Sequence, residues 1–461
     1  MYQKSSVMRR WIFYRFTVEC LDYKMKSARH KYLVFIVISV VSATLLWWLN
    51  SLPLTIKSKV TDSEFGRQLL PLYRSLRKLP DIVFFPYLFI QTDLPELSLD
   101  IESKDILYLN DNLPKSSPFT SISLDENRVF VKGMFQSDGF ISEADVRYKG
   151  LNSNHWNSFK KSYRVKFSEG HLFEGASALN LVLPSDKLYY APFLNMYRAE
   201  KFGLLTPDMR FMNVILNGEN HGVYIVSDHW SRELLDKKGV PAGSNIFGVD
   251  DGSMALFGGD NEVEYESVLS LYDIEFIGGW KSYIEEKERY KNLEALISIV
   301  DTATDEVFER EIPKLLDMEK FYRWDILTIL AGNPQYDFEN VMLLRNAETG
   351  KFEMVPIDIV INPAREHYTE NSTLSQRILS VDAFRERRNE LLAEYIDNPD
   401  NLRDDLKFYD NLYESTKGAF FKDTAKKDNN FVFMNTVAET RWHFINNFHN
   451  ARNVLENEYA R

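Results

Sequence analysis

The sequence lacks most of the residues and motifs that mark familiar enzyme classes. It has one cysteine, Cys20, among 461 residues, so no disulfide bond can form within the chain. It has no H-x-x-x-H or H-E-x-x-H spacing and no G-x-S-x-G turn. These absences argue against a disulfide-stabilised module, a zinc hydrolase and a serine hydrolase.

Glycine loops that bind phosphate are also missing. Neither G-x-G-x-x-G nor G-x-x-x-x-G-K-[ST] occurs. The Gly-Gly pairs at 258–259 and 278–279 do not have the lysine and serine context of such a loop. The common nucleotide-binding loops are therefore excluded.

Positive charge is scarce outside the N-terminus. Residues 1–31 hold eight basic and two acidic side chains, a charge of +6, whereas the whole chain carries −12, which leaves −18 for the remainder. An acidic domain does not attract nucleic acid through its overall charge. We therefore expect no nucleic-acid partner.

One long apolar run is present, at residues 32–49, and it ends with Trp47 and Trp48 near the expected membrane interface. As a helix it would be roughly 27 Å long, enough to cross the hydrocarbon core of a bilayer. The basic segment before it predicts a cytoplasmic N-terminus. We therefore expect residues 32–50 to be an uncleaved signal anchor in the lipid bilayer, with the rest extracytoplasmic, in the periplasm or at the cell surface. A cleaved signal peptide is the alternative.

The rest of the chain predicts an α+β fold. Prolines between residues 51 and 93 indicate a juxtamembrane stalk. From residue 94, short alternating segments predict an antiparallel β-rich lobe, and after residue 280 apolar residues three and four apart predict a mainly helical lobe. We expect a two-lobed domain over residues 94–395 and a C-terminal helical extension over residues 396–461, after the cytoplasmic stub at 1–31.

The segment Phe159–Phe167 alternates basic and apolar residues, as a strand with one buried and one cationic face would. Lys161 and Lys166 could bind an anion such as phosphate, or could be ordinary solvated lysines. Because side chains alternate along a strand, these two lysines should point to opposite faces. Only one of them can face a phosphate, and their neighbours favour Lys166.

Six segments, in this order, resemble motifs of the spore-coat protein H (CotH) kinase family. They are Leu94–Ile101, Val146–Gly150, Lys160–Phe167, Val214–Tyr224, Asp337–Asn340 with Val355–Asp358, and Leu374–Arg385. The resemblance implies an atypical protein-kinase-like domain, with an antiparallel β-rich N-lobe and a mainly helical C-lobe. It also implies phosphate transfer from ATP, with Mg²⁺ or Mn²⁺, to a protein or glycan hydroxyl. We expect the acceptor to be a surface protein or polysaccharide of a bacterial cell envelope.

The resemblance also implies roles for single residues. Lys166 or Lys161 would bind the nucleotide phosphates, and Asp228 would be the ion-pair partner of that lysine. Asp337 would orient the acceptor hydroxyl as the catalytic residue. Asp358 and Asn340 would hold the metal through oxygen atoms.

Each assignment has a structural alternative. Asp228 could cap the helix that follows it, and Asp337 and Asn340 could be turn residues of a loop. Asp358 lies in an apolar run, where a buried carboxylate needs a partner or a metal. Val360 stands where the family typically has a second acid, and the weaker ligand Asn362 follows it. An inactive pseudokinase that acts as an envelope scaffold or binding module is therefore the second hypothesis.

Overall fold

The computed structural model describes residues 77–114, 127–150, 153–156, 158–249, 270–284, 291–333, 341–363 and 372–459. The chain divides into two units after Pro86. Apart from the 3-10 helix Leu79–Phe89, which crosses this division, every element described below lies in the unit Tyr87–Arg461.

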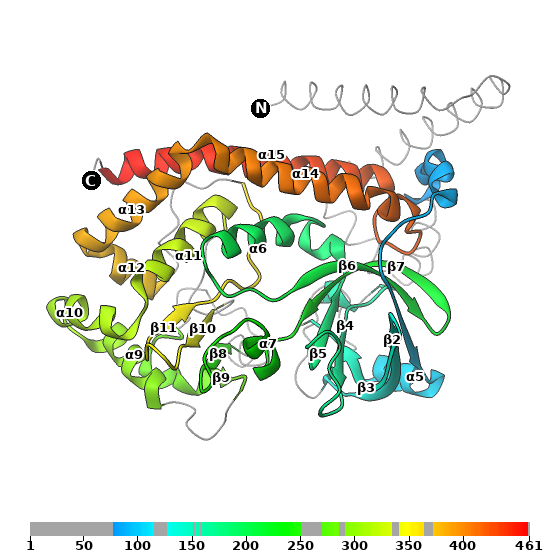
Figure 1. Cartoon of the computed structure of the whole chain (residues 1–461), viewed down its shortest axis with the longest axis horizontal. Helices are drawn as coiled ribbons and strands as arrows, with labels where there is room; N and C mark the ends of the chain where they lie inside the picture. Colours follow the sequence, from blue (N-terminus) through cyan, green and yellow to red (C-terminus); the bar gives the residue numbers. More distant parts are fainter. Residues whose placement is uncertain are drawn as a thin grey trace. The chain divides into compact units, whose positions relative to one another are not determined.

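Seven strands form a closed barrel in the order β1-β2-β3-β4-β5-β7-β6 (Figure 1). They are β1 (Glu96–Ile101), β2 (Val131–Ser137), β3 (Phe140–Tyr148), β4 (Tyr163–Phe167), β5 (Ala178–Val182), β6 (Met209–Leu216) and β7 (Glu219–Asp228). The barrel closes because β1 pairs antiparallel with β2 and parallel with β6. Buried and exposed residues alternate along β2, so one face of each pleat fills the barrel with apolar side chains.

A second sheet has the strand order β11-β10-β8-β9. Its strands are β8 (Asn245–Val249), β9 (Trp280–Ser282), β10 (Met342–Arg345) and β11 (Phe352–Met354). The α-helices are α5 (Ser103–Asp111), α6 (Ala191–Lys201), α7 (Arg232–Lys237), α9 (Lys291–Thr302), α10 (Asp305–Leu315), α11 (Met318–Ala331), α12 (Thr373–Ser380), α13 (Asp382–Asp397), α14 (Pro399–Lys422) and α15 (Asn430–Tyr459).

The long helices α14 and α15 are joined to both the barrel and the other helices. α14 packs on strand β7 and on α6, while α15 packs on α11 and α13 (Figure 1). In α6, Arg198 is fully buried and its Nε donates to Asp405 of α14 over 2.7 Å. Lys201 and Tyr395 also donate to Asp405, so this carboxylate connects three helices.

The predicted fold class is contradicted by this arrangement. The strands do not form an open antiparallel lobe beside a separate helical lobe, because the parallel β1–β6 pairing closes them into a barrel. Helix α14 is then packed on the barrel strand β7 and on α6, so the layout is not clearly that of a two-lobed kinase. The alternation of apolar and polar residues within each strand does not show that β1 pairs with β6, so the closed barrel could not be predicted from it.

The transmembrane part of the predicted fold class also finds no support. In the part of the chain that the structure describes, none of the helices has the length and apolar character needed to cross a bilayer. The predicted anchor at residues 32–50 lies outside the described residues.

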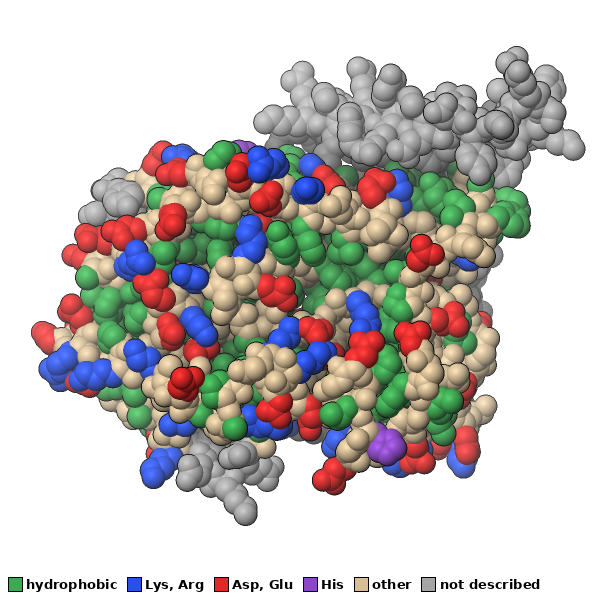
Figure 2. All heavy atoms as spheres, in the orientation of Figure 1, with side chains coloured by type: hydrophobic (Ala, Val, Ile, Leu, Met, Phe, Trp, Pro, Cys, Tyr) green, Lys and Arg blue, Asp and Glu red, His purple; other side chains and the backbone are tan. Residues whose placement is uncertain are grey.

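Local predictions agree better with the structure. The Asn-Gly pair at 217–218, between two alternating segments, predicts a β-hairpin. This is confirmed, because β6 and β7 are joined there by two residues with φ of 50° and 78°. The sequence Asn398-Pro399-Asp400 predicts a break in the C-terminal helices. This is confirmed as well, since the Asn398 side chain accepts from the Asp400 N–H at the start of α14. On the face drawn in Figure 2, acidic and basic side chains are interspersed rather than gathered by sign.

Candidate functional site

An ion pair between Lys187 and Asp358 forms the centre of the candidate site. The Lys187 Nζ lies 2.8 Å from the Asp358 Oδ1. The Lys187 ammonium holds the pKa of the Asp358 carboxyl well below its usual range, because the attraction outweighs the effect of burial. The side chain of Asp358 is nevertheless 50% exposed. The pair therefore presents an ionised carboxylate and an ammonium group that a ligand from solvent can reach.

The loop after β11 holds Asp358 in an unusual backbone conformation. Its φ is 48°, in the left-handed region that non-glycine residues rarely adopt. The flanking Ile359 and Ile361 are buried, and the side-chain amide of Asn195 on α6 donates to the Ile359 carbonyl over 2.7 Å. Strain of this kind persists only where the surrounding structure imposes it, and it is frequent at functional sites.

Lys187 is placed by an equally constrained turn. It ends the 3-10 helix η4 (Pro184–Lys187), which follows strand β5 directly. The next residues, Leu188 and Tyr189, have φ of 53° and 61°. This turn sends the rings of Tyr189 and Tyr190 into the core, where both are buried, and leaves Lys187 directed toward Asp358.

A second carboxylate, Asp186, lies beside the pair. Its side chain is 8% exposed, and its Oδ2 has no hydrogen-bond partner among the described residues. His155, in the 3-10 helix η3 (Ser153–His155), approaches this oxygen with its Nδ1 at 3.5 Å and also contacts the Ser162 hydroxyl. Burial and the nearby Lys149 and Lys187 lower the pKa of His155 to about 3, so at neutral pH the imidazole is uncharged.

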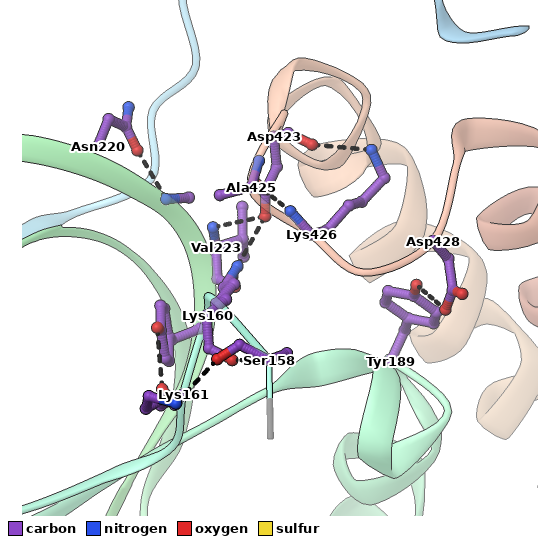
Figure 3. Close-up of polar contacts among 12 residues, drawn as sticks. Ser158, Lys160, Lys161, Tyr189, Asn220, Val223, Asp423, Ala425, Lys426 and Asp428 are labelled. Atoms are coloured by element: carbon purple, nitrogen blue, oxygen red, sulfur yellow. Dashed lines mark hydrogen bonds and ion pairs between the residues drawn. The ribbon is translucent and has the colours of Figure 1, made fainter. Parts of the chain in front are cut away.

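Charges from distant parts of the chain act on Asp186. Burial raises its pKa to about 6, and the carboxylate of Asp428 adds to this, whereas Lys427, Lys187 and Lys149 oppose it. Lys427 and Asp428 belong to the loop between α14 and α15. Asp428 accepts from the Tyr189 hydroxyl over 3.2 Å, as Figure 3 shows. The turn around Asp186 and the loop between α14 and α15, which are far apart in the sequence, therefore meet at this site.

Gly150 fits closely against the histidine. Its φ is 105°, and a Cβ added there would lie 2.2 Å from the His155 ring. The glycine of the Arg-Tyr-Lys-Gly segment is therefore needed both for its backbone conformation and for the position of His155.

A buried clasp fixes the α14–α15 loop on the barrel. The Nζ of Lys160 donates to the Asp423 Oδ2 over 2.8 Å and to the Val223 carbonyl of β7 over 2.7 Å (Figure 3). Asp423 also accepts from the backbone N–H groups of Val223, Ala425 and Lys426. The carboxylate is thus fully engaged, and it joins the segment before β4 to the end of α14.

The predicted phosphate lysines lie apart from the Lys187–Asp358 pair. Lys161 donates to the backbone carbonyls of Trp156 and Ser158 and lies 5.3 Å from the centre of the Tyr148 ring. Lys166 is exposed, and its neighbours Val165 and Phe167 are buried in the barrel. Within the described part of the chain, Asp358 pairs with Lys187 and Asp228 pairs with Lys237, not with either of these lysines.

Asp228 lies at the end of β7 and forms an ion pair with Lys237 of α7 at 2.9 Å. The cap of α7 is Ser231, whose side chain accepts from the Leu234 N–H, so Asp228 does not cap this helix. Together with Asp208 and Arg210, Asp228 lines a pocket of about 370 Å³ between the barrel, α6 and α14. The structure does not bring it together with Lys161 or Lys166.

The remaining predicted residues, Asp337 and Asn340, lie outside the described residues. Asn362 is held by Asn333, by the Ala331 carbonyl and by Asn447, which gives it a structural role at the end of α11. Among the residues that the structure describes, no three histidine, aspartate or glutamate side chains lie close enough to hold a metal ion.

Lys187, His155 and Asp186 were not predicted from the sequence. They stand in no recognisable spacing. The apolar residues of 187–203 predict a helix, and Asp186 and Lys187 lie at its start. A Ser-Asp-Lys run after Pro184, between a strand and a helix, was the only available signal. It is too common in turns to identify a site.

Comparisons with known proteins agree with the motif resemblance. The family model described as CotH kinase protein matches residues 146–455. The inner spore coat protein H of Bacillus subtilis (strain 168) is 26% identical over 319 residues, which cover 66% of this chain and 82% of that protein. A crystal structure of the Helicobacter pylori proinflammatory kinase CtkA aligns with 62% of this chain and 94% of that chain, at 13% identity and a TM-score of 0.26. A TM-score this low carries no argument about the fold.

The predicted location is corrected by these findings. A single-pass membrane protein with an extracytoplasmic kinase-like domain is contradicted, because none of the described helices suits a membrane span.

Proposed function

Because the chain belongs to the CotH kinase family, we propose that it transfers the terminal phosphate of ATP to a hydroxyl group of a protein or a glycan. The observation that carries this proposal is the Lys187–Asp358 pair, in which a strained loop presents an ionised, half-exposed carboxylate beside an ammonium group. Phosphoryl transfer depends mainly on positioning and on opposite charges around the phosphates. These two side chains supply both signs of charge within one contact.

The reaction breaks the bond between the terminal phosphorus and the bridging oxygen and forms a bond from phosphorus to the acceptor oxygen. The acceptor proton passes to a carboxylate, a role that we assign to Asp337. Lys187 and Lys149 would bind phosphate oxygens, and neutral His155 would contribute hydrogen bonding without charge. A surface protein or a polysaccharide is the acceptor class that we propose.

Mg²⁺ or Mn²⁺ is compatible with the residues present. Asp358 offers an ionised, accessible carboxylate, the oxygen ligand that Mg²⁺ prefers, and Asn340 is its proposed companion. When bound, the ion would neutralise charge on the phosphates. Mg²⁺ commonly uses only one or two carboxylates and takes its other ligands from water and phosphate, so a cluster of three protein ligands is not required.

One observation favours a catalytically weak pseudokinase as the second candidate. Val360 occupies the place of a second acid, two residues after Asp358. One anionic ligand fewer weakens Mg²⁺ binding. The same fold would then bind a nucleotide or another anion and act as a scaffold.

Thermal shift with ATP and MgCl₂ or MnCl₂, followed by transfer of labelled terminal phosphate to protein or polysaccharide acceptors, separates the two candidates. For the kinase, we expect ATP to raise the melting temperature of the full chain and labelling to be lost in Asp358→Asn. For the pseudokinase, ATP would raise the melting temperature without labelling. The absence of any shift with any nucleotide would contradict the kinase.

A further inference from the structure

Two arginines lie opposite each other on the outer face of the barrel. Arg147 of β3 and Arg164 of β4 are paired across the two antiparallel strands. The residues before and after each arginine are buried in the barrel, so both arginines point outward, where they are partly exposed. Like charges directly opposite each other repel, and an anion bound across them would remove that repulsion.

Two acceptors orient the guanidinium of Arg164. Its Nε donates to the Asn180 Oδ1 of β5 over 2.5 Å, and its Nη1 lies 2.8 Å from the Nε2 of His229, the residue after β7. Because a guanidinium can only donate, the His229 Nε2 accepts this bond. The ring is neutral, since burial and the charges of four nearby cations hold the pKa of His229 well below its usual range. His229 therefore orients Arg164 without adding charge.

The cations around His229 come from both sheets. They are Arg164, Lys149, Arg147 and Lys281. Lys281 of β9 lies two residues before Tyr283, whose ring lies beside the His229 ring with the centroids 6.1 Å apart, so β9 approaches the barrel here. Positive charge is thus concentrated where the barrel meets the second sheet, although the chain as a whole is acidic.

Lys149 connects this cluster to the Lys187–Asp358 pair. Its charge acts on His229 and also on Asp358. A path of cations therefore leads from Lys281 along the outer face of the barrel to the ion pair. Arginine and lysine groups in series suit a chain of phosphate groups, which repeats its negative charge and offers several acceptor oxygens along its length. A single small anion would contact only part of this path.

We propose that Arg147, Arg164 and Lys281 bind a chain of phosphate groups, with His229 as the positioning residue for Arg164. The chain belongs to a nucleoside triphosphate or to free polyphosphate, and its recognition by the cations is the same for both. Transfer from the end of this chain beside Asp358 rests on the proposed function, but the binding of the chain does not.

Calorimetric titration of the full chain with tripolyphosphate, ATP and AMP, without an acceptor, tests the proposal. The variants are Arg164→Gln and Lys281→Gln, with Lys132→Gln as the control, an exposed barrel lysine that pairs with Asp145 and Glu143. Lys281 is exposed, so its variant tests the site even if Arg164→Gln does not fold. We expect tripolyphosphate binding to weaken about 10-fold or more in Arg164→Gln, about 3-fold or more in Lys281→Gln, and not at all in Lys132→Gln. AMP, with one phosphate, should bind more weakly than ATP.

Two substitutions of His229 separate positioning from a general effect on the fold. In His229→Gln the side-chain oxygen can still accept from Arg164, whereas His229→Leu removes the acceptor. We expect His229→Leu to weaken tripolyphosphate binding and His229→Gln to retain most of it. Equal binding by wild type and His229→Leu would contradict the positioning role.

Three results would overturn the proposal: no tripolyphosphate binding by the wild-type chain, equal affinity in wild type and Lys281→Gln, or an equal loss in Lys132→Gln. Tighter binding of ATP than of tripolyphosphate would identify a nucleotide as the ligand, and the reverse would identify free polyphosphate; both support the site. Because the assay requires no phosphate transfer, binding that depends on Lys281 in a chain without transfer activity would support this inference and contradict the proposed kinase function.

Discussion

Asp186 shows how a single side chain can make stability depend on pH. Its neighbours are His155 on η3, Lys187 on η4, Lys149 after β3, and Lys427 and Asp428 on the α14–α15 loop. Burial and the Asp428 carboxylate raise the pKa of Asp186 from 3.8 to about 6, against the opposing effect of the three lysines. Between these values the folded state binds more protons than the unfolded state, so this residue makes stability fall as the pH rises through the window from about 4 to 6.

Replacing Asp186 by asparagine removes that dependence. At pH 7, where the carboxylate is ionised, we expect the free energy of unfolding of Asp186→Asn to exceed that of the wild type by up to about 3 kcal/mol. The difference should shrink toward pH 4, because both side chains are then neutral. Urea unfolding of both proteins at several pH values measures it. A constant difference across this range would show that Asp186 does not titrate as described.

Gly150 gives a second prediction for a single residue. We expect Gly150→Ala to destabilise the protein by more than the roughly 1 kcal/mol typical of alanine at a positive φ, because the added Cβ would meet the His155 ring at 2.2 Å. Gly139→Ala is the matched control, since Gly139 has φ of 80° and nothing within 4 Å of an added Cβ. Equal losses of unfolding free energy in the two variants would contradict a close contact with His155.

Residue roles were harder to predict than residue classes. The acid Asp358 was singled out because a carboxylate in an apolar run requires a partner, and the structure supplies Lys187. The partner itself could not be found, because it lies 171 positions away in a short 3-10 helix. The pairing of Lys160 with Asp423 could not be predicted either, because Asp423 lies 263 positions later in the chain. The alternation of basic and apolar residues around β4 carries no information about so distant a partner.

At the scale of elements, the Lys160–Asp423 clasp determines how the α14–α15 loop meets the barrel. Both side chains are buried, at 4% and 1% exposure. Burial lowers the pKa of Lys160, and the attraction and hydrogen bond of the Asp423 carboxylate oppose this. Removing one partner would leave the other as an uncompensated buried charge.

We therefore expect Lys160→Met to lower the free energy of unfolding by about 3–5 kcal/mol. The control is Lys132→Met on β2, whose exposed lysine pairs with Asp145 and Glu143, and which should change stability by less than about 1 kcal/mol. Chemical denaturation measures both. Similar, small effects would show that the clasp contributes little.

Single strands and helices were predicted correctly where one pattern of apolar residues, or one clear turn sequence, dominates the segment. The β6–β7 hairpin follows from its Asn-Gly turn and alternating flanks, and the break between α13 and α14 follows from Asn398 and Pro399. The closure of the barrel could not be derived in this way. It depends on the parallel pairing of β1 with β6, whose residues are more than 100 positions apart.

At the scale of the whole molecule, α14 and α15 contribute to the domain rather than only extending it. Asp405 of α14 pairs with the buried Arg198, and Asp423, directly after α14, pairs with the buried Lys160. A chain that ends at residue 395 would leave both cations buried without their carboxylates. We expect such a chain to be largely unfolded or aggregated, which circular dichroism and size-exclusion chromatography would reveal. A cooperative thermal transition in the truncated chain would contradict this.

The central claim is that the chain transfers phosphate from ATP at a site formed by the Lys187–Asp358 pair. The rate of labelled phosphate transfer by the full chain tests this claim most directly. Wild type, Asp358→Asn and Lys187→Met should be compared at saturating Mg²⁺ or Mn²⁺, with Lys132→Met as a surface control. We predict a decrease of about 10²-fold or more in the two site variants and no change in the control. Equal transfer by wild type and Asp358→Asn would contradict the claim.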